Sequence, residues 1–224
     1  MSHLRTHRNF GIIPRASGAA AAALKARAVA WDVPLEETAD ALSLFVWGCE
    51  LRLIPGDDDV RVELSAPESR LIGNLQDSAT ELFAEAGLDV QWDRVDAGAL
   101  APGLSLMRVA SVRQRSPGFI RVRLAGPDAA RFGTGSLHFR LLLPPAGRAA
   151  LWPRIGASGR TEWPTGADAL HRPVYTVAEQ AADWLDFDIF RHAGSPTCDW
   201  ALSGPEGAEV GIIGPGGGWC PDAD

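Results

Sequence analysis

Apolar and polar residues alternate with a period of two in several short segments of the first hundred residues. Residues 49–54 (CELRLI) and 60–65 (VRVELS) both alternate, and the PGDDD segment between them has the composition of a turn. A further short strand is predicted at 88–93 (LDVQWD). The pattern therefore predicts a β-hairpin followed by one more strand.

Two segments of the same region favour helix. Residues 14–29 are rich in alanine, and between 67 and 86 apolar residues recur at i, i+3, i+4 and i+7 before Gly87, which can end a helix. Helices and strands that each have one apolar face predict an α+β fold. We expect a basic arm over 1–14, and then a small α/β sandwich, with helices on an antiparallel sheet, as an accessory domain over 15–96.

The pattern changes after residues 97–106 (AGALAPGLSL), which have the composition of a linker. Short alternating segments then recur between Gly and Pro residues at intervals that are typical of an antiparallel barrel. One short helix is expected around 197–202. The predicted barrel domain covers 104–224, and its strands are expected within 104–116, 118–126, 135–145, 172–180, 184–193 and 209–217.

Composition narrows the classes of function. The chain of 224 residues has 46% hydrophobic residues and a net charge of -7, so a role in binding nucleic acid is disfavoured. Three widely separated cysteines and five histidines show neither a disulfide framework nor zinc-type spacing, and no metal site is predicted. No apolar stretch approaches the roughly 20 residues that cross a bilayer. We expect a cytoplasmic protein without membrane insertion.

Candidate chemistry begins in HRPVYTVAEQ (171–180), where Arg172 precedes Tyr175 and Thr176 on a predicted strand. A guanidinium can bind phosphate with two hydrogen bonds, an aromatic ring can lie against a flavin, and a hydroxyl can bond to a ring edge. An edge-strand arginine and a core tyrosine would give the same pattern.

Two further segments could contact a ligand. In FDIFRHAGSPTCDWALSGPEG (187–207) a strand leads to His192 and then to a helix start, where free N–H groups can bind pyrophosphate. The glycines of GPGGG (214–218) allow a backbone to approach a ligand closely. An ordinary capped turn and a simple glycine turn remain alternatives.

Together these segments resemble the siderophore-interacting proteins, a branch of the ferredoxin-reductase-like flavoproteins. LLLPP (141–145), HRPVYTV, LDFDIFRH, SPTCDWA and IIGPGGG follow the family's order over roughly residues 104–224. The resemblance implies a six-stranded antiparallel β-barrel of the ferredoxin-reductase flavin-binding type that holds FAD. It implies no catalytic acid or base, and it implies these cofactor-binding residues: Arg172 at the phosphates, Tyr175 and Thr176 at the flavin, His192 in the cleft, Pro196, Thr197 and Cys198 at the pyrophosphate, and Gly214 and Gly216 in the glycine turn.

Three features depart from the family pattern. Two residues separate Arg172 from Tyr175, where the pattern has one. Because an extra strand residue reverses the face of a side chain, Arg172 either lies on a bulge or does not reach the phosphate. The interval from His192 to Trp200 is one residue shorter than usual. Cys198 replaces a serine, which weakens that bond while the backbone N–H remains.

The resemblance also implies a function. Family members continue past the glycine turn, through an acidic link that PDAD (221–224) resembles, into an NAD(P)H-binding domain, which we expect to be absent from this chain. The complete architecture moves electrons from NAD(P)H through FAD to a ferric siderophore and releases iron. The expected partners are the ferric siderophore and a separate reductase or second chain.

Other hypotheses stay open at this point. The chain could be a non-catalytic binding or scaffold protein with a degenerate flavin-type barrel, which the altered spacing before Tyr175 favours. An oligonucleotide-binding barrel has little support because the net charge is negative. The first domain weakly resembles small uncharacterised α+β domains that precede siderophore-interacting flavoproteins, and this likeness implies no activity.

Overall fold

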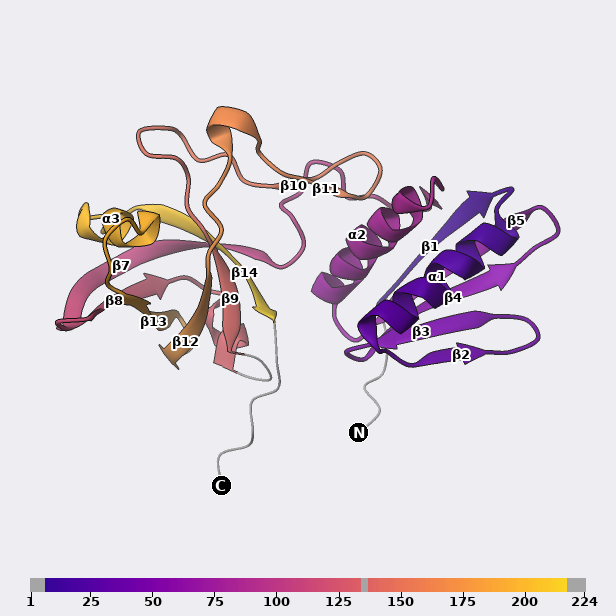
Figure 1. Cartoon of the computed structure of the whole chain (residues 1–224), viewed down its shortest axis with the longest axis horizontal. Coiled ribbons are helices and arrows are strands. Elements are labelled where there is room, and N and C mark those ends of the chain that lie inside the picture. The colour runs from indigo at the N-terminus through magenta and orange to yellow at the C-terminus, as the bar shows by residue number, and fades with distance from the viewer. Residues whose placement is uncertain (1–6, 134–136, 217–224) are drawn as a thin grey trace, which may run out of the picture. The chain divides into compact units, whose positions relative to one another are not determined.

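The structure is a computed structural model that describes residues 7–133 and 137–216. The chain divides into two compact units (Figure 1). Unit 1 comprises residues 1–102 together with 153–162, and unit 2 comprises residues 103–152 together with 163–224. No helix within the described ranges is long and apolar enough to cross a membrane.

Unit 1 is an antiparallel sheet of six strands with two helices on one face (Figure 1). The strand order is β2-β3-β4-β5-β1-β6, and the helices contact each other as well as the central strands. The predicted hairpin and both helices are confirmed. The elements are β1 (His7–Pro14), α1 (Ser17–Trp31), β2 (Leu35–Glu37), β3 (Leu42–Val46), β4 (Cys49–Pro55), β5 (Asp59–Ala66), α2 (Ser69–Glu85) and β6 (Gln91–Trp92).

Alternation explains why this sheet has one buried face. On β5, Val60 and Val62 are buried under the helices, while Arg61 between them is exposed. On α2, Ile72 and Phe83 lie on the stripe that faces the same core. The period of two in the strands and of 3.6 in the helix therefore meet in one apolar layer.

The expected basic arm over 1–14 is wrong for residues 7–14. These residues form β1, an inner strand that pairs with β5 along its whole length and with β6 near its end. Asn9, Gly11 and Ile13 are its buried face, and the Asn9 side chain donates to Gln76 at 2.9 Å. The charged and small residues masked this alternation in the sequence. Residues 1–6 lie outside the described residues.

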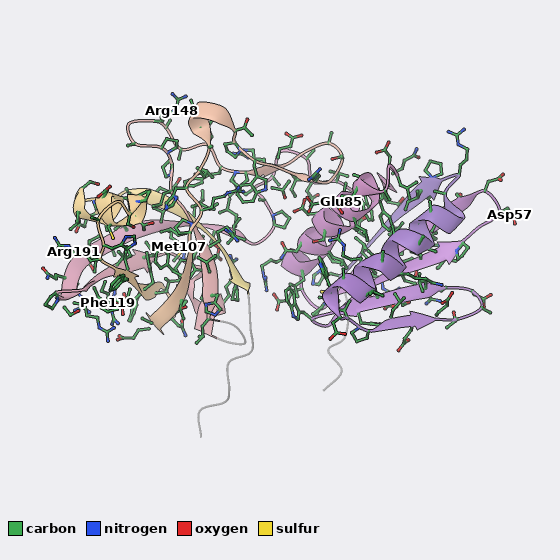
Figure 2. All side chains as sticks on the ribbon, in the orientation of Figure 1. Asp57, Glu85, Met107, Phe119, Arg148 and Arg191 are labelled. Carbon is green, nitrogen blue, oxygen red and sulfur yellow. The ribbon has the colours of Figure 1, made fainter. Side chains whose placement is uncertain are left out.

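Unit 2 contains a closed barrel with the strand order β12-β13-β8-β7-β14-β9, which confirms the predicted six-stranded antiparallel barrel (Figure 1). The inward residues are large and apolar, for example Phe139 and Phe187. Met107 belongs to the same core (Figure 2). The elements are β7 (Leu104–Ser116), β8 (Phe119–Ala125), β9 (His138–Leu142), β12 (Val174–Gln180), β13 (Trp184–Phe190), α3 (Pro196–Leu202), β14 (Glu209–Gly216) and short 3₁₀ helices at Ala129–Gly133 and Gly166–Asp168.

One segment of the expected barrel domain belongs to unit 1 instead. Residues 153–162 form a small hairpin of β10 (Arg154–Ile155) and β11 (Thr161–Glu162), which lies between β9 and β12 in the sequence. The Thr161 N–H donates to Asp77 of α2 at 2.6 Å. Because two-residue strands carry almost no periodic signal, the sequence pattern could not assign this segment.

Candidate cofactor site on the barrel

The strand β12 carries two of the predicted site residues, and its register with β9 continues without a break to the residues before it. Tyr175 pairs with Phe139 and Thr176 with His138, and the same register continues to the bridge between His171 and Leu143. The bulge that was one alternative for Arg172 is therefore not found. By alternation Arg172 lies on the outer face with the exposed Thr176, and Tyr175 points inward.

A shallow pocket of about 300 Å³ lies beside this part of β12, lined by residues 174–178 and Asp188. It forms because β13 pairs with β12 only from Val177 onward. The carbonyl oxygen of Pro173 and the N–H of Val177 form hydrogen bonds on the side of the strand that faces β9. In an antiparallel ladder, successive residues direct their polar groups to opposite sides. The N–H and C=O groups of Val174 and Thr176 therefore face the pocket.

Tyr175 is part of the barrel core and reaches the start of α3. Its ring centroid lies 4.8 Å from that of Phe187, and its hydroxyl forms a hydrogen bond with Thr197. Burial raises the pKa of Tyr175, and the bond to Thr197 opposes this rise. The Nε2 atom of His171 also lies 2.9 Å from the Thr197 hydroxyl. The structure thus brings together two predicted residues, Tyr175 and Thr197, and adds His171, which sequence reasoning missed.

Thr176 and Gly216 meet at the same neighbour on β9. The Thr176 hydroxyl lies 3.0 Å from Nδ1 of His138, and Gly216 is the β14 partner of His138. His138 was missed as a site residue. The sequence contained a signal for His138, because the polar residues His138 and Arg140 stand on either side of the buried Phe139 on this strand.

Gly214 is required by packing within the barrel. Its φ is +152°, and a Cβ there would lie 3.1 Å from the carbonyl oxygen of His138 and 3.2 Å from the ring of Phe132. Side chains rarely adopt this backbone conformation. The glycine therefore has a structural role whether or not a ligand approaches it.

The Arg172 guanidinium lies on the outer face of the barrel. The Cζ atom lies 4.6 Å from the ring centroid of Trp163, and the Arg172 carbonyl accepts a bond from the Arg140 side chain at 2.8 Å. Within the described residues, no oxygen atom bonds to the Arg172 guanidinium. A cation in this state can bind an anionic ligand. Neither Trp163 nor Arg140 was predicted.

The start of α3 is capped by the protein itself. The N–H of Cys198 donates to the Ser195 hydroxyl at 3.3 Å, and its buried thiol contacts the carbonyl of Phe190 at 3.4 Å. Both Cys198 donors are thus engaged inside the protein, which leaves the predicted contact of Cys198 with pyrophosphate without a donor in this structure. Pro196 occupies the first turn and is exposed.

His192 lies beyond the end of β13 and is exposed. Its ring stacks on Phe190 with centroids 6.1 Å apart, and Nδ1 lies 3.2 Å from the carbonyl of Ala193. No contact among the described residues joins it to Tyr175 or Thr176. The predicted residues therefore form one group around β12 and another around the end of β13.

An ion-pair network supports the pocket from the neighbouring strands. Arg121 of β8 donates to both oxygens of Asp188, at 2.8 and 2.9 Å, and to Glu179 of β12 at 2.7 Å. Arg115 of β7 also pairs with Asp188. Chiefly because of the bond from Arg121, the pKa of Asp188 lies below its usual range. This network compensates the charge of Asp188 at the pocket wall, and Arg121 of β8 ties β12 to β13.

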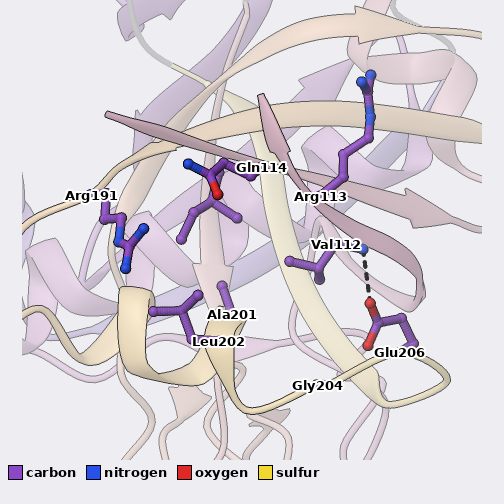
Figure 3. A pocket seen from close by; sticks show the side chains of 9 residues that line it. Val112, Arg113, Gln114, Arg191, Ala201, Leu202, Gly204 and Glu206 are labelled. Carbon is purple, nitrogen blue, oxygen red and sulfur yellow. Dashed lines mark hydrogen bonds between the residues drawn. The ribbon is translucent and has the colours of Figure 1, made fainter. Parts of the chain in front are cut away.

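A second depression of unit 2 contains none of the predicted site residues (Figure 3). It lies between β7, β8 and the end of α3, and the Arg191 guanidinium points toward Leu202 (Figure 3). The N–H of Val112 donates to Glu206 at its edge, at 3.1 Å. The lining residues are Val112, Arg113, Gln114, Ile120, Arg191, Ala201, Leu202, Gly204 and Glu206.

Comparison with known proteins finds relatives that match about half of this chain. Ferric vibriobactin reductase ViuB from Vibrio cholerae is 33% identical over 110 residues, which are 46% of this chain and 39% of that protein. The chain thus spans less than half the length of this relative. The siderophore-interacting protein SipS from Aeromonas hydrophila is 25% identical, with a TM-score of 0.40, over 50% of this chain and 43% of that chain.

A siderophore utilization protein from T. fusca is 26% identical, with a TM-score of 0.42, over 54% of this chain and 47% of that chain. The family described as the siderophore-interacting FAD-binding domain matches residues 108–219, which are 112 of the 224 residues. This match covers the barrel strands, except for the first four residues of β7, and the pocket beside β12. The chain belongs to the siderophore-interacting FAD-binding domain family.

Proposed function

We propose that unit 2 binds FAD on the outer face of β12, as the flavin-binding part of a ferric-siderophore reductase. The observation that carries this proposal is the arrangement around the pocket. A guanidinium without an oxygen partner among the described residues and the hydroxyl of Thr176 lie on one face, next to a stretch of strand whose polar groups face the opening. These groups fit a dinucleotide that carries both phosphates and a polar heterocycle.

Each group has a stated part in this proposal. Arg172 binds the phosphates, because a guanidinium can donate two parallel hydrogen bonds to them. The backbone of Val174 and Thr176 offers donors and acceptors to the polar edge of the flavin. Tyr175, held by Thr197, forms the inner wall, and Gly214 and Gly216 bring the backbone of β14 close to His138.

Bound FAD supplies the capacity to accept a hydride from NAD(P)H and to pass on its electrons one at a time. The substrate is a ferric siderophore, in keeping with the name of the ViuB relative. Reduction releases the metal because ferrous iron binds oxygen chelators more weakly than ferric iron. Electron transfer of this kind needs no acid or base from the chain. NAD(P)H is the proposed donor, bound by a further domain or a separate reductase.

Titration of the purified chain with FAD tests the binding. Flavin fluorescence should be quenched on binding, and Arg172→Ala should weaken the affinity about tenfold, since a charge-assisted bond to phosphate is lost. Arg113→Ala, which removes an arginine at the other depression, is the matched control. An unchanged flavin spectrum with the wild-type chain would exclude this function and favour the scaffold hypothesis.

A second experiment tests the electron transfer without NAD(P)H. The FAD-loaded chain is reduced chemically under anaerobic conditions and mixed with a ferric siderophore, while a ferrous chelator reports the reduced iron. The expected result is oxidation of the flavin together with two ferrous ions for each FAD. Ferrous iron that forms at the same rate with free reduced FAD would argue against a role of the protein.

A further inference from the structure

The connection between β9 and β12 passes through unit 1 and returns to the barrel at Trp163. Tryptophans flank the excursion on both sides and contact the barrel. Trp152 donates from Nε1 to Glu209 of β14 at 3.1 Å, and the ring of Trp163 lies under the guanidinium of Arg172. The residue that contacts Arg172 therefore directly follows the hairpin of residues 153–162.

Unit 1 holds this hairpin at several points. The Thr161 N–H donates to Asp77 at 2.6 Å, and Arg160 pairs with Glu81 at 2.6 Å. Gly159 has a φ of +86°, and a Cβ there would lie 2.7 Å from the Gln76 side chain. Only glycine allows the hairpin to lie this close to α2. The attachment fixes the chain immediately before Trp163.

The backbone and the side chain of Arg172 are fixed by different parts of the molecule. Barrel pairing fixes the backbone, through the bridge of His171 with Leu143 and the bond from Leu141 N to Pro173 O. Among the described residues, the guanidinium forms a cation–π contact with the ring of Trp163 and no hydrogen bond or ion pair. A cation–π contact engages no oxygen acceptor, so the guanidinium keeps its capacity to bind phosphate.

We propose that Trp163 is a positioning residue, which holds the Arg172 guanidinium ready for the phosphates of the dinucleotide. The inference rests on the proposed FAD site.

A double-mutant cycle on FAD affinity tests the role of Trp163. Trp163→Ala should weaken FAD binding about two- to fivefold, the effect of one exposed cation–π contact. In an Arg172→Ala background the same substitution should have no further effect, because its only target is gone. Trp163→Phe should restore part of the affinity. Independent, multiplying effects of the two substitutions would overturn the role.

A measurement without FAD tests the contact itself. The Arg172 Nε–H resonance, identified by its loss in Arg172→Ala, should carry a ring-current shift that disappears in Trp163→Ala.

Persistence of the full ring-current shift in Trp163→Ala would overturn the inference. A wild-type chain that does not bind FAD contradicts the proposed function, and the resonance comparison still decides whether Trp163 positions the Arg172 side chain.

Discussion

Replacement of Arg121 by methionine should destabilise the barrel by about 3 kcal/mol. The Arg121 side chain is 6% exposed and donates three hydrogen bonds, two to Asp188 and one to Glu179. Removal of one partner of a buried ion pair costs about 3–5 kcal/mol, because the remaining charge stays in a poorly solvated site. Arg115 still pairs with Asp188, and the 58%-exposed Glu179 can turn to water. The lower end of that range therefore applies.

Equilibrium unfolding in urea measures this effect. With an m-value of about 2 kcal/mol/M, the transition of unit 2 should move down by about 1.5 M. The Arg121→Met/Asp188→Asn double variant should lose less stability than the sum of the single variants, by about 2 kcal/mol. The exposed pair of Lys25 and Glu37, at 46% and 62% exposure, is the control, and its coupling should be below about 1 kcal/mol. Equal coupling energies for the two pairs would refute the reasoning.

Three further outcomes are expected. Because the pKa of Asp188 is lowered, its contribution to the unfolding free energy is complete above the ordinary carboxyl pKa of about 4 and is lost as the pH falls through the lowered value. In an acid titration, the unfolding free energy of Asp188→Asn should lack this pH-dependent contribution. Tyr175 is the only tyrosine of the sequence, so phenolate absorbance reports its ionisation alone. Its contribution to the unfolding free energy is complete below about pH 10 and is lost as the pH rises through the raised pKa. Thr197→Val removes the bond that opposes the rise and should therefore raise the pKa of Tyr175 further, whereas a lower pKa would contradict the assigned contact. Gly214→Ala should lower the unfolding free energy by about 1–3 kcal/mol in a thermal melt, while Gly118→Ala, whose Cβ would meet only an ordinary contact at 3.9 Å, should change it little.

The barrel could be predicted from the sequence because its signals are local. Each strand has alternating apolar residues next to Gly and Pro. Residues such as Phe187 and Leu141 are buried because removal of their own apolar surface from water is favourable. The segment around Tyr175 and Thr176 was recognisable for the same reason, since the residues are neighbours in the sequence. The strand β1 was missed because Asn9 and Gly11 occupy buried positions without being strongly apolar.

The sequence by itself, through its alternation and its turn residues, determined the class of fold, most of the strands and the segment that carries the candidate site. Only the tertiary structure decided that the hairpin at 153–162 belongs to unit 1 and that Ser195 accepts a hydrogen bond from the Cys198 N–H. It also decided that Arg172 forms a cation–π contact with Trp163 and that Arg121 bonds to both Asp188 and Glu179. The physical reason is the range of the interactions. The preference for burial is a property of each residue and can be read from the sequence. Ion pairs and stacking contacts depend on which distant segments the closed barrel and the sheet bring together.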